Sequence, residues 1–453
     1  MKRKLAGVTA VALASVLALG ACSSGSDTSS GGGASTDGKG KTITLWLAGA
    51  DTPDALRSYL KKEFTKETGG KLNIQQQDWG DIVTKLTTAL PDANNTPDVT
   101  EMGNTQSPTF TNVGAFLDIS DMYKDLGGSN LLQSFVQAGE VSGKNYTLPY
   151  YFGSRYVFYR KDIWAKAGIT TVPTTLDEFN TDVTTIAEKN PAGIANFSGF
   201  YLGGQDWRDG ISWIFANGGD IAKESGGKWT ATLDDPATLK GLEQLQALYK
   251  SASNAPNDAK DSNQYIYLND DDAIPGATTT DPTTPVSLAA ATIMAPGWAH
   301  WSIGTKGEKD GKVTRTWDDN TFGVFALPGN DGKPAPVFAG GSNIGISAKS
   351  KNPGLAKTLL KIIFSKTYQE MLGKNGLGPA NSKYVSSLGD DEFAKALISS
   401  ASNSKLTPAA PGWASVESSN VLEEFFSKIK DAPDLKALAT QYDSKITPML
   451  NAK

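Results

Sequence analysis

The sequence predicts an α/β protein of two domains, built around a doubly wound parallel sheet. The first observation is a regular alternation of strand patterns with amphipathic helix patterns over residues 42–102. The second is length, because 453 residues exceed the roughly 100–200 residues of one domain. The third is composition, since 39% hydrophobic and 20% charged residues are typical of a globular protein with a sizeable core.

The first 41 residues are predicted to lie outside this fold. Residues 1–22 combine a basic start, an apolar run and small residues before Cys22, a pattern that resembles a secretory leader with a bacterial lipobox. Cys22 is the only cysteine, which favours a lipid-bearing first residue of the mature protein over an accidental cysteine in an ordinary secretory signal. Residues 23–41 are rich in Gly, Ser and Asp, which predicts a flexible linker.

The body of the chain then shows strands and helices in turn. Strands are predicted over 42–47, 71–77 and 97–102, where β-branched and apolar residues gather. Helices are predicted over 53–68, 79–90, 234–251, 352–366 and 418–429. In the first helix Leu56, Leu60 and Phe64 recur at helical spacing. Asp51 could cap this helix or contact a ligand, and the cap is the favoured interpretation.

Charge and motifs exclude several classes of protein. The net charge is −5 and no basic cluster follows the N-terminus, so nucleic-acid binding has no support. Histidine and cysteine clusters are absent, and so are the glycine-rich nucleotide motifs, which predicts no metal and no cofactor. The only histidine, His300, has no G-x-S-x-G partner, so no catalytic residue is predicted. The 48 acidic residues still leave a glycosidase open.

Four blocks of the body carry the motifs of a known family. They are TITLWLAGADTPDALRSYLKKEFTKETG (42–69), TPDVTEMGNTQSPTFTNVGAFLDISD (96–121), GKNYTLPYYFGSRYVFYRKDIWAKAGIT (143–170) and GGSNIGISAKSKNPGLAKTLLKIIFS (340–365). In content and order they resemble the family 1 extracellular solute-binding proteins, the sugar-binding lipoproteins of ABC importers related to maltose-binding protein. The resemblance covers nearly all of residues 42–450.

The resemblance implies a two-lobed, periplasmic-binding-protein-like fold of type II, with the ligand cleft between lobes that are joined by hinge crossings. Lobe 1 is expected to comprise residues 42–150 plus roughly 305–350, and lobe 2 residues 151–304 plus roughly 351–453. In open α/β sheets ligands lie beyond the carboxyl ends of the strands, which draws attention to the loops at those ends.

Polar candidates for ligand binding lie on these loops and crossings. The loop after the third strand contributes short polar groups and could also be an ordinary turn; its residues are Glu101, Asn104, Thr105 and Gln106. By the register of the family the other polar candidates are Tyr151, Arg155, Asp206, Ser342 and Asn343. A carboxylate of the family is missing at Gly153, so the hydrogen bonds to a sugar must differ there, and Arg208 could pair with a carboxylate.

Aromatic candidates are four tryptophans, although an arbitrary tryptophan would be expected in the core. Loop placement and family register favour a ligand-facing position for Trp79, Trp207, Trp298 and Trp413. In the stretch APGWAHWSIG (295–304) we expect Trp301 to pack inward or to brace Trp298, and His300 to be structural. Removing Trp298 or Trp413 is expected to weaken sugar binding at least tenfold without unfolding the protein.

The implied function is the substrate-binding component of an ABC sugar importer. It would close around a mono- or oligosaccharide, with amino sugars such as chitobiose or N-acetylglucosamine slightly favoured, and deliver it to a membrane permease. We expect a monomer at the outer face of the bacterial cytoplasmic membrane, held there by its lipid anchor only. The alternatives are a secreted glycan-active hydrolase and a sugar-binding receptor or adhesin of the same fold.

Overall fold

The computed structural model describes residues 35–260, 264–270, 288–309 and 312–452. The predicted leader with Cys22, and most of the predicted linker 23–41, lie outside the described residues. Among the helices within the described ranges, none has the length and apolar content that crossing a membrane requires.

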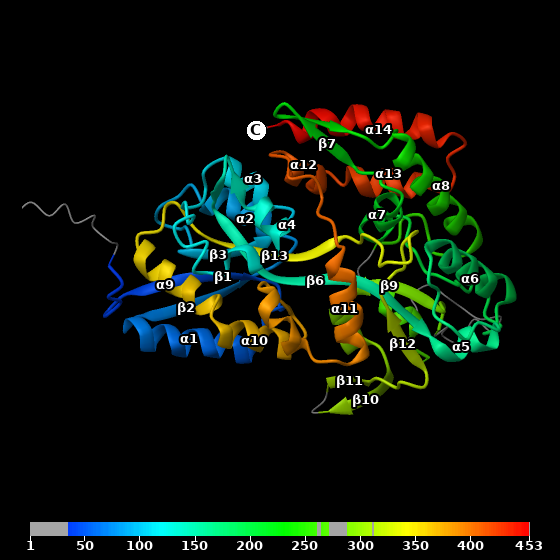
Figure 1. The fold of residues 1–453 in the computed structure, drawn as a ribbon, viewed down its shortest axis with the longest axis horizontal. Helices are drawn as coiled ribbons and strands as arrows, with labels where there is room; N and C mark the ends of the chain where they lie inside the picture. The colour runs from blue at the N-terminus through cyan, green and yellow to red at the C-terminus, as the bar shows by residue number, and fades with distance from the viewer. Residues whose placement is uncertain (1–34, 261–263, 271–287, 310–311, 453) are drawn as a thin grey trace, which may run out of the picture. The chain divides into compact units, whose positions relative to one another are not determined.

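The predicted strand–helix units at the start of the body are present. β1 (Thr42–Ala48) lies between β2 (Lys71–Gln77) and β3 (Val99–Gly103), and all three strands are parallel. The helix α1 (Asp54–Thr68) covers one face of these strands and α2 (Ile82–Ala89) the other, as Figure 1 shows. Local periodicity therefore predicted this part of the fold correctly.

The two helices bury opposite sides of the same strand. Side chains alternate along a strand, so Leu45 and Leu47 of β1 join the core under α1, whereas Trp46 and Ala48 join the core under α2. The carboxyl ends of the three parallel strands meet at one edge, which is where the loops named above begin.

The sheet as a whole is mixed, so the prediction of a parallel sheet is wrong beyond β3. The strand order is β12-β6-β13-β3-β1-β2, and β9 and β14 also pair with β6. Among the described residues, every pair of this sheet outside β1–β2 and β1–β3 is antiparallel. The added strands are β6 (Thr147–Arg160), β9 (Thr292–Pro296), β12 (Phe322–Phe325), β13 (Ala339–Ile346) and β14 (Gly378–Pro379). Their partners lie far away in sequence, so no local pattern reports their direction.

The 14-residue strand β6 passes from one apolar core to the other (Figure 1). Leu148 belongs to the core around β1, whereas Val157 belongs to the core around α7 (Trp207–Ala216). We call the elements of these two cores lobe 1 and lobe 2. The strand β13 crosses beside β6, because Val337 just before it lies in the core of lobe 2 and Ile344 in that of lobe 1.

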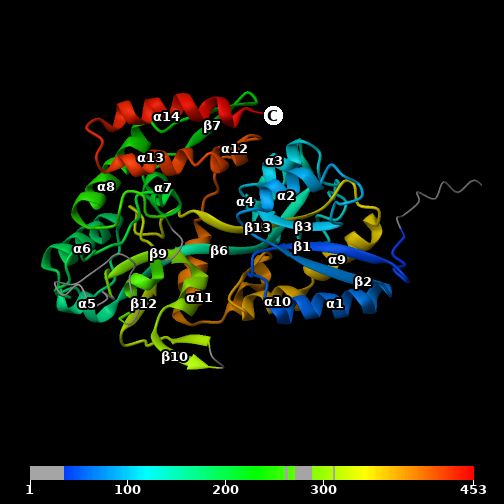
Figure 2. The same ribbon diagram turned by 180° about the vertical axis from the view of Figure 1, so that it is seen from behind.

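The two cores differ from the expected lobe limits in the later part of the chain. The helices α9 (Pro353–Ile363) and α10 (Lys366–Lys374) pack in the core of lobe 1, although their residues were expected in lobe 2. Figure 2 shows both helices beside α1, in the same half of the molecule as the parallel strands β1, β2 and β3. Residues 305–350 are divided between the cores, with Leu327 on the side of lobe 2. Because the chain crosses between the lobes within a strand, no change in composition marks in the sequence where one lobe ends and the other begins.

The remaining elements complete the two lobes and their connections. Those before residue 236 are α3 (Ser107–Asn112), η1 (Gly128–Asn130), α4 (Gln133–Ala138), β4 (Glu140–Val141), β5 (Lys144–Asn145), α5 (Lys161–Lys166), α6 (Leu176–Lys189), β7 (Ala222–Ser225) and β8 (Lys228–Ala231). Those after it are α8 (Pro236–Ser251), η2 (Gln264–Leu268), η3 (Gly297–Ser302), β10 (Thr305–Lys309), β11 (Lys312–Thr316), η4 (Ser382–Leu388), α11 (Glu392–Ser402), α12 (Trp413–Ser418), α13 (Val421–Ile429) and α14 (Leu435–Leu450). The predicted helices at 234–251, 352–366 and 418–429 correspond to α8, α9 and α13.

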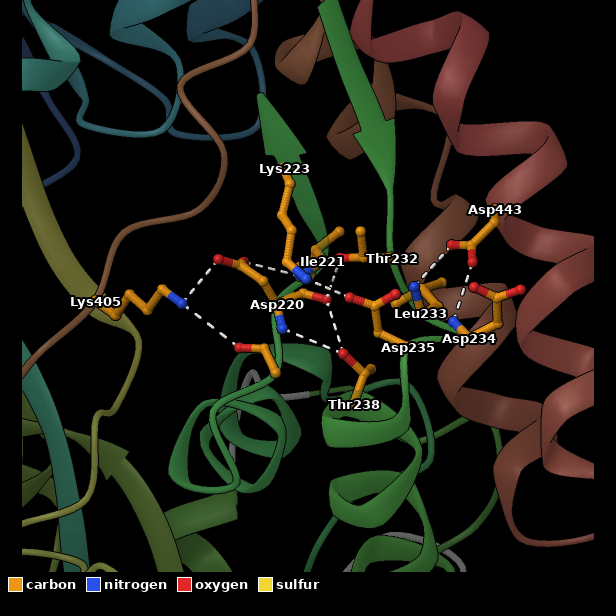
Figure 3. Close-up of polar contacts among 11 residues, drawn as sticks. Asp220, Ile221, Lys223, Thr232, Leu233, Asp234, Asp235, Thr238, Lys405 and Asp443 are labelled. Atoms are coloured by element: carbon orange, nitrogen blue, oxygen red, sulfur yellow. Dashed lines mark hydrogen bonds and ion pairs between the residues drawn. The ribbon is translucent and has the colours of Figure 1, made fainter. Parts of the chain in front are cut away.

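Polar contacts attach the end of the chain to lobe 2 (Figure 3). The carboxylate of Asp443 on α14 accepts hydrogen bonds from the backbone N–H groups of Leu233 at 2.8 Å and Asp234 at 3.0 Å. Burial raises the pKa of Asp443 to about 6. The ammonium of Lys405, on the coil between α11 and α12, lies 2.7 Å from a carboxylate oxygen of Asp220. This coil and α14 are thereby fastened to the segment around β7 and β8.

Candidate functional site

Asp51 organises the first group of candidate residues, at the carboxyl ends of the parallel strands. Its Oδ2 accepts hydrogen bonds from the indole N–H of Trp79 at 2.9 Å and from the phenol of Tyr151 at 2.7 Å. The favoured interpretation of Asp51 as a helix cap is wrong, because Pro53 occupies the N-cap position of α1 and no side chain caps it. Asp51 instead joins the loop after β1, the loop after β2 and the crossing strand β6.

A glycine sets the position of the Trp79 ring. Gly49 has a φ of +55°, and a Cβ there would lie 2.6 Å from Trp79 Cδ1 and Nε1. On its other side Trp79 Cζ3 lies 3.6 Å from the position of a Cβ on Gly103. The half-buried ring therefore extends from the end of β1 to the end of β3, with its indole N–H held by Asp51.

Glu101 lies completely buried behind this group. Its Oε2 accepts a hydrogen bond from the backbone N–H of Ala48 at 2.9 Å, and its Oε1 accepts one from the hydroxyl of Ser342 at 2.7 Å. Burial raises the pKa of Glu101 to about 8. Glu101 and Ser342, both candidates from the sequence, thus join β1, β3 and β13 beneath the surface.

The loop after β3 is tied to the crossing strand β13. Asn104 donates from Nδ2 to the carbonyl of Ala339 at 2.6 Å, and its backbone N–H donates to the carbonyl of Gly341 at 3.3 Å. The candidate Gln106 accepts a hydrogen bond from the N–H of Gly103 at 3.3 Å. Asn343 is fully buried and donates to the carbonyl of Phe135 at 2.9 Å. The amides of Asn104 and Asn343 therefore brace the crossing.

A buried ion pair forms the centre of the second group, in lobe 2. Arg155 Nη1 lies 3.1 Å from Asp209 Oδ1, and the two side chains are 7% and 1% exposed. The guanidinium of Arg155 also lies 5.9 Å from the centre of the Phe338 ring. The candidate Asp206 caps α7, since its Oδ1 accepts the backbone N–H of Asp209 at 3.0 Å.

Two of the candidate tryptophans are buried beside this ion pair. Trp207 and Trp413 meet edge to face with ring centres 6.2 Å apart, and neither is exposed. The indole of Trp207 donates to Glu423 Oε1 at 3.0 Å, and the guanidinium of Arg208 lies 4.5 Å from the Trp207 ring centre. Arg208 thus covers an aromatic ring as a cation, a contact that the sequence did not suggest.

The two groups approach each other at α3 and α12. The backbone N–H of Ala414 donates to the hydroxyl of Thr109 at 3.3 Å. Burial raises the pKa of Glu417, while its interactions with Arg208, Thr105 and Trp413 lower it. Thr105 of lobe 1 therefore faces the carboxyl of Glu417 near the second group. Glu417 was not predicted, although its position four residues after Trp413 on one helix places both on one face.

Trp298 is the most exposed of the four candidate tryptophans. It lies on η3, with 50% of its surface exposed, and meets Tyr265 edge to face at 6.0 Å between ring centres. The preceding strand β9 pairs Pro296 with Arg155, which links η3 to the buried ion pair. Of the two positions expected for Trp301, the inward one is wrong, because 68% of Trp301 is exposed.

The structure therefore brings the predicted residues together in two groups. The first contains Trp79, Glu101, Asn104, Thr105, Gln106, Tyr151, Ser342 and Asn343, and the second contains Arg155, Asp206, Trp207 and Trp413, with Trp298 next to it on η3. No trio of His, Cys, Asp or Glu side chains suited to a metal ion occurs among the residues that the structure describes. The groups offer aromatic faces, amides, hydroxyls and carboxylates.

Comparison with known proteins shows to which family the chain belongs. Residues 49–370 match the family of bacterial extracellular solute-binding proteins. The chain belongs to this family. It is 32% identical to the diacetylchitobiose binding protein DasA of Streptomyces coelicolor, over 99% of each chain.

Solved structures of similar fold show the architecture of the chain and the range of ligands that this fold can bind. The sugar-binding protein MalE from Xanthomonas citri superposes with a TM-score of 0.71 at 17% identity, covering 90% of this chain and 97% of that chain. UgpB from Mycobacterium tuberculosis, solved with glycerophosphocholine, superposes with a TM-score of 0.69 at 18% identity, covering 90% and 98%. The expected two-lobed periplasmic-binding-protein fold is confirmed. Because one of these proteins binds sugar and the other was solved with a phosphodiester, the chemistry of the ligand must come from side chains rather than from the fold.

Membership of the extracellular solute-binding proteins makes this chain a binding protein by class.

The buried carboxyl group of Glu101 allows a test of the structure of the first group. Glu101→Gln is expected to flatten the dependence of stability on pH. The pKa of Glu101 is about 8 in the folded state against an ordinary value of 4.5, so the folded protein keeps a proton there that the unfolded chain releases. That stabilisation is complete below pH 4.5 and is lost as pH rises through about 8, by up to about 1.4 kcal/mol per pH unit.

Urea unfolding of both proteins at pH 5 and pH 8 measures this effect. The wild-type protein should lose more free energy of unfolding than the Gln variant over this interval, because Gln keeps the shape of the side chain without the titration. Equal losses in the two proteins would mean that Glu101 is ionised in the folded state throughout.

Proposed function

We propose that this solute-binding protein is the saccharide-binding component of a bacterial ABC importer. The observation that carries the proposal is the approach of two polar and aromatic groups from different lobes, with Thr105 facing Glu417 and Thr109 bonded to Ala414. A ligand held by both groups would favour the closed arrangement of the lobes over the open one, as in the hinge closure of periplasmic binding proteins around their ligands.

The chemistry of the two groups suits a pyranose ring. Trp79 and Trp298 are the partly exposed candidate rings, and an aromatic plate can cover the apolar C–H face of a sugar. Asp51 and Tyr151 supply polar atoms next to Trp79 that can reach hydroxyl groups at the rim of the sugar. Each hydrogen bond adds only about 0.5–1.5 kcal/mol, so micromolar affinity requires several of them together with stacking.

The ligand proposed first is an oligomer of N-acetylated amino sugar. DasA is named for diacetylchitobiose, and its 32% identity extends over 99% of this chain rather than over a shared segment alone. The protein is proposed to carry no catalytic residue and no cofactor. It is further proposed to act as a monomer that is lipidated at Cys22, and to release its saccharide to the permease of a separate ATPase-driven transporter.

Replacing Trp298 with alanine is expected to weaken binding of N,N′-diacetylchitobiose at least tenfold, because the ring is half exposed and available for stacking. Isothermal titration calorimetry on the purified protein measures the affinity. Trp46→Ala is the matched control, since Trp46 lies half buried on β1, where its indole donates to Gln75 rather than joining either group.

Wild-type and Trp298→Ala proteins of equal affinity would contradict the role of Trp298. Absence of binding to any saccharide in a panel of amino-sugar and neutral oligosaccharides would contradict the proposed function as a whole. The same mixtures, tested for new reducing ends after incubation, distinguish binding from hydrolysis.

A further inference from the structure

Trp301 is the exposed aromatic residue that the proposed function leaves unused. Trp298 and Trp301 are 50% and 68% exposed, and both lie on the 3₁₀ helix η3. A 3₁₀ helix has three residues per turn, so side chains three positions apart eclipse each other. With a rise of about 2 Å per residue, the two rings project from one side of η3 about 6 Å apart along its axis.

Aromatic neighbours hold both rings. His300 lies 3.9 Å from Trp301 between ring centres, at 43°, and its own ring is held by the carbonyl of Gly297 at 2.8 Å from Nδ1. Phe393 of α11 packs on the other side of His300 at 4.6 Å. Trp298 in turn meets Tyr265. The rings are therefore supported from behind and need not be ordered by a ligand.

A cavity of about 140 Å³ lies beside Trp301. One wall comes from η3 and α11, and the other comes from the end of α10 at Gly373 and Lys374. The wall from α10 belongs to lobe 1, whereas η3 and α11 pack in a separate apolar cluster with Tyr156 of β6 and Ile293 of β9. Asp391 and Lys374 are the charged residues that line the cavity, beside aromatic, glycine, leucine and alanine residues. Oδ1 of Asp391 accepts the backbone N–H of Ala394 at 2.7 Å.

This combination has the chemistry of a saccharide site. Exposing two large aromatic rings side by side is unfavourable unless they contact a partner. Flat rings suit the C–H faces of sugars, and charged groups at the rim suit their hydroxyls. The axial separation of the rings is close to the length of one pyranose unit. Trp301 also lies one turn after Trp298 on the same 3₁₀ helix, and the proposed function already places Trp298 against the ligand.

We propose that Trp301 is a second stacking plate, so that η3 binds a saccharide chain longer than a disaccharide, with the added sugar ring lying over Trp301 beside Asp391 and Lys374. This inference rests on the proposed function. Trp301 then determines the preference for chain length rather than the affinity for the first two rings.

The test compares affinities for N-acetylglucosamine oligomers of two and of four rings. The wild-type protein should bind the longer oligomer more tightly than the disaccharide. Trp301→Ala should lose about three- to tenfold in affinity for the longer oligomer and keep its affinity for the disaccharide. Trp301→Phe, which keeps an aromatic plate, should retain most of the gain, and Trp46→Ala should behave as the wild type.

The remaining outcomes overturn the proposal. Trp301→Ala with wild-type affinity for both oligomers shows that Trp301 does not contact the ligand, while the proposed function still stands on binding of the disaccharide. An equal loss for both oligomers shows that Trp301 shapes the first site instead of extending it. If Trp301→Ala binds both oligomers like the wild type but cells that carry it take up less saccharide, then Trp301 contacts the transporter rather than the ligand. No saccharide binding by the wild type contradicts the proposed function itself.

Discussion

Replacing Trp413 with alanine is expected to lower the free energy of unfolding by about 3–5 kcal/mol. Trp413 is fully buried, meets Trp207 at 6.2 Å between ring centres and belongs to the core of lobe 2. Removing the indole leaves a cavity that the surrounding helices can fill only in part. The structure thus changes the expectation from the sequence, under which Trp413→Ala would leave the fold intact. Urea unfolding followed by circular dichroism measures the loss.

Trp298→Ala is the matched control for this variant. It also truncates a tryptophan, but Trp298 is half exposed, so its loss of stability should be small by comparison. Trp413→Phe should recover much of the stability, because a ring still fills the space. If Trp413→Ala unfolded at the same urea concentration as the wild type, the Trp413 ring would have to lie outside the core in solution.

Replacing Asp209 with alanine is also expected to cost about 3–5 kcal/mol of stability. The guanidinium of Arg155 lies 3.1 Å from Asp209, and both side chains are almost completely buried. Removing the carboxylate leaves a buried cation without this compensating charge, which costs more than the pair contributes over an apolar replacement. The double variant Arg155→Met with Asp209→Leu is therefore expected to lie much closer to the wild type than Asp209→Ala.

The double variant also tests Arg155 as a ligand contact. If it folds and binds saccharide with wild-type affinity, then Arg155 acts on the structure of the crossing rather than on the ligand. A double variant as unstable as Asp209→Ala would contradict the argument from uncompensated charge. Equilibrium unfolding and calorimetry on the same preparations give both measurements.

The exposure of the two tryptophans around His300 could not be predicted from the sequence pattern. Trp301 follows Trp298 by three positions, and the sequence predicts that Trp298 faces the ligand while Trp301 packs inward or braces Trp298. The segment is a 3₁₀ helix, whose shorter repeat places both rings on one side, and both are exposed. His300 has the structural position expected of it, with burial lowering its pKa and its ring packed between Trp301 and Phe393.

The hydrogen-bond partners of the polar candidates could not be predicted from the sequence either. Glu101, Asn104 and Asn343 were chosen as polar groups on ligand loops, but each is buried and bonded to other parts of the chain. Their partners lie up to 241 positions away in the sequence. The types of these side chains suit a sugar and a backbone carbonyl equally well, so only the distances decide which of the two they contact here.

Local pattern was sufficient for much of this protein. Strand and helix periodicity located β1, α1, β2, α2 and β3, and the order of four motif blocks identified the family and its two-lobed fold. These features depend on interactions between residues close in the chain or on motifs that a family shares. The direction of β6 and β13, the burial of Trp207 and Trp413, and the partnership of Asp51 with Trp79 and Tyr151 depend on segments far apart in sequence. Such contacts follow from how the two cores pack around the crossing strands, and no periodicity within a single segment encodes them.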